Sequence, residues 1–205
     1  TWSGRPTTAD PLNIRTVVVD PTCTLVGTLQ PVGTLLPAIG LRQSAIAASG
    51  TSSYLIAWRS EDTIRARSIT SATGAPLSPD SLLLTPPIGE IYSMVRLAAN
   101  NNGYVMVTAR RGPVAAGSKV SLELQRVTVT GDAAPALVGP PPLVTDKIDD
   151  TFDGFSVASH PLGPILVTWH ACNDNGDGEG CGVFGRFIAT NGTPQGEPFL
   201  IPTTT

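Results

Sequence analysis

Residues Ile165–Ile201 read ILVTWHACNDNGDGEGCGVFGRFIATNGTPQGEPFLI. Apolar runs of strand length, such as the run that ends at Trp169, alternate in this stretch with segments rich in Gly, Asn and Asp. Short apolar runs bounded by such turn residues predict β-strands. The dipeptide Asn191-Gly192 is typical of a tight hairpin turn. We therefore predict an antiparallel sheet over this part of the chain.

The same order of segments occurs earlier in the chain. Residues Ala45–Leu84 repeat it closely, and residues Val95–Val144 repeat it more loosely. Trp58 and Trp169 occupy the same position in the second strand of their copies, and Thr108 takes that position in the middle copy. The third strand of each copy carries an arginine, at Arg67, Arg126 and Arg186. A unit of four short strands that recurs about every sixty residues is typical of a β-propeller blade.

The repeat predicts an all-β fold of about three and a half four-stranded antiparallel β-propeller blades. Trp2 aligns with Trp58 and Trp169, so the chain begins in the middle of a blade. Because a closed propeller typically has about four to eight blades, we expect the rest of a larger propeller to come from the same gene product or from another chain. An array of β-sandwiches is the alternative fold. The predicted units are a partial blade over 1–41 and blades over 42–88, 89–150 and 151–205.

The composition restricts the function classes. The chain has 21 Gly and 19 Pro, which suit tight turns, and only 14% of its residues are charged. The net charge is -3 and no basic patch is visible, so we expect no nucleic-acid partner. No apolar run reaches the ~18 residues of a membrane-spanning helix. Because the chain begins at Thr1 without an initiator Met, we expect a leader or upstream segment to have been removed.

The chain has three cysteines. Cys172 and Cys181 flank a turn rich in Gly, Asp and Asn, which brings two predicted hairpin strands together. We predict a disulfide between them, and a disulfide implies an oxidising compartment, either extracellular, at the cell surface or periplasmic. Cys23 is left over. We expect it to be buried as a small apolar residue or paired outside this chain.

The last copy resembles the repeats of secreted bacterial β-propeller proteins. From Trp169 to Phe199 it carries the string W…DNGDGEG…GVFGRF…NGTP…GEPF, which is similar to the recurring pattern W…DGDG.GIFGQRF…DGTP.G..F of that group. The resemblance is good over Ile165–Thr205, fair over Ala45–Thr85 and weak in the middle copy. It implies a propeller fold and an extracellular setting. The group has no single shared activity, so the resemblance implies no catalytic residue.

Two groups of residues are candidate metal ligands. Several oxygen ligands in one short acidic turn suggest a Ca²⁺ loop. These ligands are Asp174, Asn175, Asp177 and Glu179. Gly176 falls where regular ligand spacing needs an oxygen, so a polar turn closed by the disulfide is the alternative. His170 lies two residues before Cys172 and, with His160, suggests a transition-metal or catalytic site. An ordinary histidine at a blade edge is the alternative.

Other residues suggest sugar or anion binding. Paired carboxylates perform glycoside hydrolysis, and the connector before the last copy contains Asp146, Asp149, Asp150 and Asp153. A solvated loop also explains this segment. Trp58 and Trp169 are candidate ligand-binding residues, because exposed tryptophans at a propeller rim stack on sugars. At the ends of buried strands they pack between blades instead. The three recurrent arginines suit either a ring for acidic ligands or solvent-facing strand positions.

No GxSxG elbow, P-loop or HExxH motif occurs in the sequence. We therefore predict a non-catalytic extracellular binding or scaffold module for protein–protein interaction or surface assembly. An open blade edge must be covered, so the expected partner is another protein chain or the remainder of a larger propeller. The alternative is a carbohydrate-binding, lectin-like or glycoside-hydrolysing propeller with glycans as partners. No cofactor is expected apart from the candidate Ca²⁺.

Overall fold

The structure is a computed structural model that describes residues 2–4, 12–35, 43–50, 52–101, 103–112, 119–148, 154–172 and 181–202. Every regular element in these ranges is a β-strand, and the paired strands run antiparallel. The prediction of an all-β fold is therefore confirmed. The described strands form four sheets, each built from strands that follow one another in the chain.

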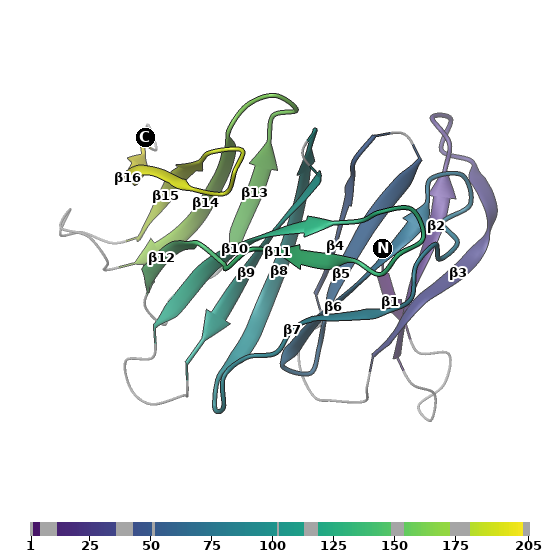
Figure 1. Ribbon diagram of the computed structural model, residues 1–205, viewed down its shortest axis with the longest axis horizontal. Helices are drawn as coiled ribbons and strands as arrows, with labels where there is room; N and C mark the ends of the chain where they lie inside the picture. The colour runs from purple at the N-terminus through teal and green to yellow at the C-terminus, as the bar shows by residue number, and fades with distance from the viewer. Residues whose placement is uncertain are drawn as a thin grey trace.

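The first two sheets come from the N-terminal part of the chain (Figure 1). The first sheet has the order β1 (Trp2–Gly4), β2 (Leu12–Val19) and β3 (Leu25–Leu35). The second sheet has the order β4 (Ser44–Ala48), β5 (Ser53–Ser60), β6 (Thr63–Thr70) and β7 (Ser81–Leu84).

The third sheet is less regular than its neighbours. It begins with β8 (Ile91–Asn100), β9 (Gly103–Arg111) and β10 (Val120–Thr128). Two segments then share the outer edge of β10, namely β11 (Ala136–Val138) and β12 (Leu143–Ile148). The fourth sheet has the order β13 (Phe155–Ser159), β14 (Ile165–Cys172), β15 (Cys181–Ile188) and β16 (Pro194–Ile201).

The turns between strands carry the residues that the sequence suggested. Between β15 and β16, Gly192 has a φ of 93°, and the Thr193 N–H donates a hydrogen bond to Asn191 Oδ1 at 3.0 Å. Between β6 and β7, Gly74 has a φ of 71°. Glycine adopts such positive φ angles without the steric cost that a Cβ brings. Asn191-Gly192 is therefore a turn, as predicted, and Thr73-Gly74 is a second turn.

The sheets stack face to face in chain order, and an apolar cluster fills each gap between consecutive sheets. Members of the three clusters, in chain order of the gaps, are Ile14 with Trp58, Leu55 with Met106, and Leu124 with Trp169. A sheet covered on both faces needs continuous apolar runs rather than alternating ones. The run Leu55–Trp58 meets this need, because all four residues are 0% exposed.

The first strands of the second, third and fourth sheets lie next to one another. β8 contacts β4 on one side and β13 on the other. The Arg96 Nη1 donates to Gln43 Oε1 at 2.9 Å, and its guanidinium lies 5.8 Å from the centre of the Phe155 ring. The Ser159 hydroxyl donates to the Ala99 carbonyl. These three sheets thus meet along one common edge, which their first strands form.

Candidate functional site

The two tryptophans of the second strands lie between sheets. Trp58 is 0% exposed and Trp169 is 4% exposed. Trp58 lies opposite Arg65 and Trp169 lies opposite Phe184 in the strand registers. The Trp58 ring packs so closely on Gly33 that a Cβ added there would overlap it. Each tryptophan therefore packs against the preceding sheet, and neither ring has a free face for stacking on a sugar.

Two third-strand arginines join neighbouring sheets. The Arg67 Nη1 donates to the Val32 carbonyl of β3 at 2.7 Å. The Arg186 Nη1 donates to the Val144 carbonyl of β12, also at 2.7 Å. Each arginine thus reaches from the third strand of its own sheet to the last strand of the preceding sheet. These two inter-sheet arginines hold the stack together through hydrogen bonds to backbone carbonyls.

Arg126 does not belong to this series. Thr108, in the position of the tryptophans, lies opposite Glu123, so the position of the inter-sheet arginines falls to Gln125. Arg126 comes one residue later and, because successive side chains in a strand point to opposite faces, it faces the following sheet. Its side chain lies near Gly192 there. The alignment of Arg126 with the other two arginines is therefore wrong by one residue.

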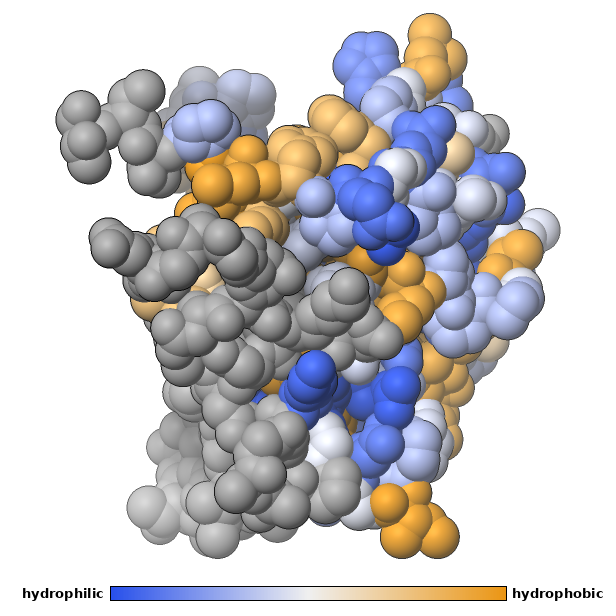
Figure 2. Space-filling model, turned by 90° about the vertical axis from the view of Figure 1, so that its left-hand side faces the viewer, coloured by the Kyte–Doolittle hydropathy of each residue, from blue (hydrophilic) through white to orange (hydrophobic). Residues whose placement is uncertain are grey.

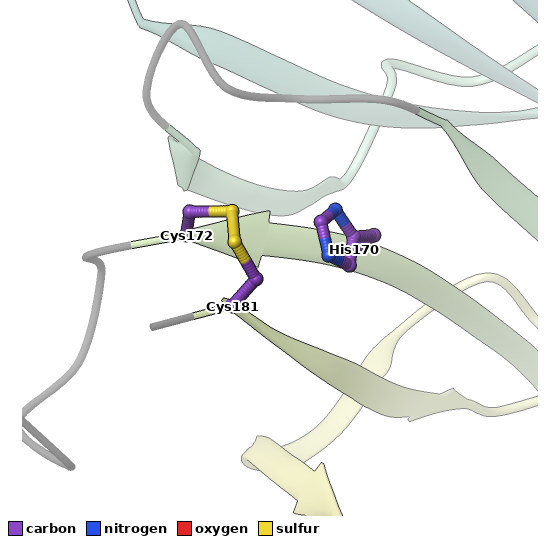
Figure 3. A group of neighbouring side chains, drawn as sticks. All are labelled: His170, Cys172 and Cys181. Carbon is purple, nitrogen blue, oxygen red and sulfur yellow. A yellow bond between two sulfur atoms is a disulfide. The ribbon is translucent and has the colours of Figure 1, made fainter. Parts of the chain in front are cut away.

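Cys172 and Cys181 lie opposite each other in β14 and β15 and form a disulfide (Figure 3). The predicted disulfide is confirmed, and it indicates an oxidising, extracellular-type environment. His170 lies two residues before Cys172, on the same face of β14. Figure 3 shows its imidazole beside the disulfide. One ligand atom of His170 and the two sulfur atoms all lie within 4.8 Å of one another.

Two other candidate residues lie in turns. His160 follows β13, and its Nδ1 accepts a hydrogen bond from the Leu162 N–H at 3.2 Å. Cys23 lies between β2 and β3 with its thiol free and exposed, so the expectation that it is buried is wrong. Its pairing outside this chain stays a prediction. In the same turn, hydrogen bonds from the Thr22 hydroxyl and the Thr24 N–H hold the pKa of Asp20 below its ordinary value.

The acidic candidates lie mostly outside the described residues. This applies to the predicted Ca²⁺ ligands Asp174, Asn175, Asp177 and Glu179. It applies also to Asp149, Asp150 and Asp153, which are candidates for glycoside hydrolysis. Asp146 belongs to β12. Both hypotheses therefore stay predictions.

The first sheet has an incomplete edge. β1 pairs only with residues 13–15 of β2, whereas β5 and β14, of 8 residues each, pair along their whole length with the third strands of their sheets. Among the described residues, no strand pairs with Thr16–Val19 on the side away from β3. A groove of about 290 Å³ lies beside this segment, and Ile46, Tyr54 and Ile69 of the second sheet form its other wall.

Ile46 shows what this edge leaves uncovered. It lies opposite Ile56, two residues after Ser44, which pairs with Trp58. Leu97 and Val157 hold the same register position in the third and fourth sheets. Leu97 is 9% exposed, and Val157 packs against the cluster between the third and fourth sheets. Ile46 is 41% exposed. It faces the first sheet, in which β1 corresponds to the second strand of the other sheets. Among the described residues, no strand of the first sheet corresponds to β4, β8 or β13.

Both ends of the stack expose apolar side chains. On the fourth sheet, Phe187 and Phe199 stack with ring centres 5.5 Å apart and are 42% and 38% exposed. Figure 2 views the molecule from this end and shows apolar surface there. At the opposite end, Val19 and Leu25 of the first sheet are 50% and 66% exposed. Within the part of the chain that the structure describes, neither outer sheet is covered on both faces as the inner sheets are.

The third sheet contains a group of charged residues that the sequence motifs did not reveal. The Arg110 Nε donates to Glu123 Oε1 at 2.6 Å, and the Arg110 Nη1 pairs with the Glu90 carboxylate. The Tyr92 hydroxyl donates to Glu123 Oε2 at 3.4 Å. Burial and then the negative charge of Glu123 raise the pKa of Tyr92 to about 12. Burial opposes the charge of Arg110, yet the two carboxylates raise its pKa. Strand register brings these residues together, so no short motif could have found them.

Comparison of the chain with protein-family models, with curated proteins and with solved structures gives no match. Within the described ranges, no helix is long and apolar enough to cross a membrane.

Proposed function

We propose that the chain forms consecutive blades of a β-propeller and acts as a non-catalytic, extracellular binding or scaffold module. Three observations support this fold. The sheets stack in chain order, the first strands of three sheets adjoin, and Trp58 and Trp169 repeat the same packing against the preceding sheet. The disulfide supports the extracellular setting.

The observation that carries the binding function is the exposure of Ile46 beside the open edge of β2. Its equivalent in the third sheet, Leu97, is buried, and its equivalent in the fourth sheet, Val157, is partly buried against an apolar cluster. The groove therefore lies where the other sheets make an inter-sheet contact. Unpaired backbone groups of a strand edge accept an added strand, and alternate side chains of that strand then fill neighbouring pockets. We assign this groove to one class of partner, a β-hairpin that carries apolar side chains at alternate positions.

The second sheet defines how such a hairpin would fit. There, β4 and β5 form the hairpin, and Tyr54, Leu55 and Ile56 lie opposite Ile69, Ser68 and Arg67 of β6. Trp2 lies opposite Arg15 just as Trp58 lies opposite Arg65, so Arg15 of β2 corresponds to Arg65 of β6. By the same register, Val19, Val18 and Val17 of β2 correspond to Ile69, Ser68 and Arg67 of β6. A hairpin with the sequence of residues 43–56 therefore matches the open edge and stops short of β1.

A synthetic peptide with the sequence of residues 43–56 tests this proposal. We expect saturable binding to the full chain, measured by calorimetry, and slower hydrogen exchange for those amides of Thr16–Val19 that face away from β3. Ile46→Asp in the full chain should weaken binding of the unaltered peptide about tenfold or more. Binding would cover the exposed part of Ile46, and an aspartate there would lose its hydration without gaining a partner. Leu82→Asp is the matched control, since Leu82 is 52% exposed and lies in β7, away from the groove.

Equal binding by the two variants, or protection of amides elsewhere in the chain, would contradict the proposal. A second copy of the chain is the competing occupant. Sedimentation measures self-association of the chain. If Ile46→Asp abolishes self-association and the peptide does not reduce it, the occupant of the groove is a second copy of the chain and not a hairpin.

A further inference from the structure

We propose that reduction of the disulfide turns Cys172, Cys181 and His170 into a binding site for a borderline or soft metal ion such as Zn²⁺ or Cu⁺. The inference rests on the geometry of the fourth sheet. It does not depend on the proposed binding of a hairpin at the first sheet, so either proposal can fail alone.

Strand geometry brings the three side chains together. His170 and Cys172 lie two residues apart in β14, so both project from the same face of the sheet. Cys181 lies directly opposite Cys172 in β15, and it is therefore the diagonal neighbour of His170. Figure 3 shows the imidazole and the two sulfur atoms on one side of the β14–β15 pair. Because two paired strands hold the group, the ligands are arranged before any ion arrives.

The donor set suits these metals. Two thiolates and one imidazole are ligands that Zn²⁺ and Cu⁺ accept, whereas Ca²⁺ and Mg²⁺ require oxygen. Bonds of about 2.3 Å to sulfur and about 2.0 Å to nitrogen separate the donors of a tetrahedral site by roughly 3.5 Å. The donors already lie within 4.8 Å of one another, so small side-chain rotations bring them into place. Two thiolates neutralise Zn²⁺, and a fourth position stays open to water.

The change of state is a two-electron reduction. A dithiol reductant attacks Sγ of Cys181, which is the exposed member of the pair, and the sulfur–sulfur bond breaks. This step releases the Cys172 thiolate and leaves Cys181 in a mixed disulfide with the reductant. The second thiol of the reductant then attacks the reductant's own sulfur in the mixed disulfide and releases Cys181 as a thiolate. The products are two protein thiols and the disulfide of the reductant. Metal binding then displaces the two thiol protons into solvent, and His170 donates a nitrogen lone pair.

Cobalt(II) is the probe for the site, used with the full chain carrying Cys23→Ser so that the free exposed thiol does not contribute. After reduction with a dithiol and its anaerobic removal, we expect one equivalent of Co²⁺ to give thiolate-to-cobalt charge-transfer bands, and Zn²⁺ to abolish them. The unreduced protein should give none. Cys172→Ser with Cys181→Ser should also give none.

His170→Gln tests the nitrogen ligand, and His160→Gln is its matched control. Loss of a residue that merely supports a metal ligand costs about 10–100-fold in affinity, so loss of the ligand itself should weaken Co²⁺ binding at least about tenfold. His160→Gln should bind as the parent does. Circular dichroism of each variant before reduction shows whether it folds.

Thiol alkylation gives a second measurement that does not depend on the spectrum. Zn²⁺ should slow the reaction of both cysteines with iodoacetamide in the parent and in His160→Gln, and much less in His170→Gln. Equal affinities and equal protection in the two histidine variants would remove His170 from the site. Charge-transfer bands in the double serine variant, or their absence in the reduced parent, would overturn the proposal.

Discussion

The second and fourth sheets each turn a tryptophan and an arginine toward the preceding sheet, whereas the third sheet turns Thr108 and Gln125 there. Trp58 fills its gap and lies against Gly33. Thr108 is 0% exposed, and neither its hydroxyl nor the Gln125 Oε1 has a hydrogen-bond partner among the described residues. In the second sheet, the Trp58 Nε1 and the Arg67 Nε also lack a partner among the described residues. The copies therefore differ in the size of the side chain that fills the inter-sheet position, and not in the hydrogen bonding of that position.

This difference shows which parts of the repeat the stack requires. The order of the first three strands and the register between β9 and β10 persist in the third sheet, although the tryptophan and the inter-sheet arginine are absent. Its contact with the second sheet is made instead by the apolar residues around Met106 and Tyr104. We infer that apolar burial between sheets maintains the fold, and that the tryptophans and inter-sheet arginines add stability at particular gaps.

Substitution at the tryptophan position should have the largest effect, with opposite signs in the two kinds of sheet. Trp58→Ala leaves a cavity between the first and second sheets and should reduce the free energy of unfolding by about 3–5 kcal/mol. Thr108→Val keeps the volume and removes an unsatisfied buried hydroxyl, so it should raise that free energy by about 1 kcal/mol. Denaturant unfolding followed by circular dichroism measures both values.

A destabilisation by Thr108→Val comparable to that of Trp58→Ala would show that the hydroxyl has a structural partner, and the comparison between the sheets would then fail at this position. A Trp58→Ala variant no less stable than the parent would show that the gap closes without the indole.

An intermediate effect is expected for the arginines. Arg186→Met removes hydrogen bonds from a charged group to the Val144 and Gly196 carbonyls and should cost about 1.5 kcal/mol. Arg126→Met, one residue out of register with the inter-sheet position, should change the free energy of unfolding by less than about 0.5 kcal/mol. Both values come from the same denaturant titrations. Equal costs would restore Arg126 to the series that the sequence suggested.

The repeat of four strands could be predicted from the sequence, because each strand and each turn has its signal in a short stretch of consecutive residues. Apolar runs such as Tyr54–Trp58, and turns such as Asn191-Gly192, predict their own conformation. The disulfide between Cys172 and Cys181 was predictable for the same reason, since a single hairpin connects the two residues. Arg126 shows where such reasoning fails. A shift of one residue moves a side chain to the other face of a sheet, and an alignment of loosely similar copies cannot fix register to one residue.

The candidate sites depend on contacts between strands and sheets, and these were harder to predict. His170 was noticed beside Cys172 in sequence, but its closeness to Cys181 depends on the register of β14 with β15. The groove beside β2 depends on how far β1 extends, and no motif encodes that length. Arg110 of β9 pairs with Glu123 of β10 and with Glu90, which directly precedes β8. Because these residues come from three segments of the chain, their pairing is visible only in the structure.

The charged group of the third sheet should have the smallest effect on the free energy of unfolding at neutral pH. Its effect should become measurable at alkaline pH. Glu123 there takes the register position that Arg65 and Phe184 hold in the other sheets, and it helps to raise the pKa of Tyr92 from 10.0 to about 12, after burial. A pKa that is higher in the folded state means that the folded protein holds the phenol proton more tightly than the unfolded chain. The contribution of Tyr92 to stability is therefore complete below pH 10 and is lost as the pH rises toward 12.

Tyr92→Phe should lose less stability than the parent across this range, measured by urea unfolding at stepped pH. Tyr104→Phe, measured at neutral pH, gives the separate cost of losing a buried tyrosine hydroxyl. Parallel pH profiles for the parent and Tyr92→Phe would show that Tyr92 does not titrate differently in the two states, and the charged group of the third sheet would then have no measurable role in alkaline stability.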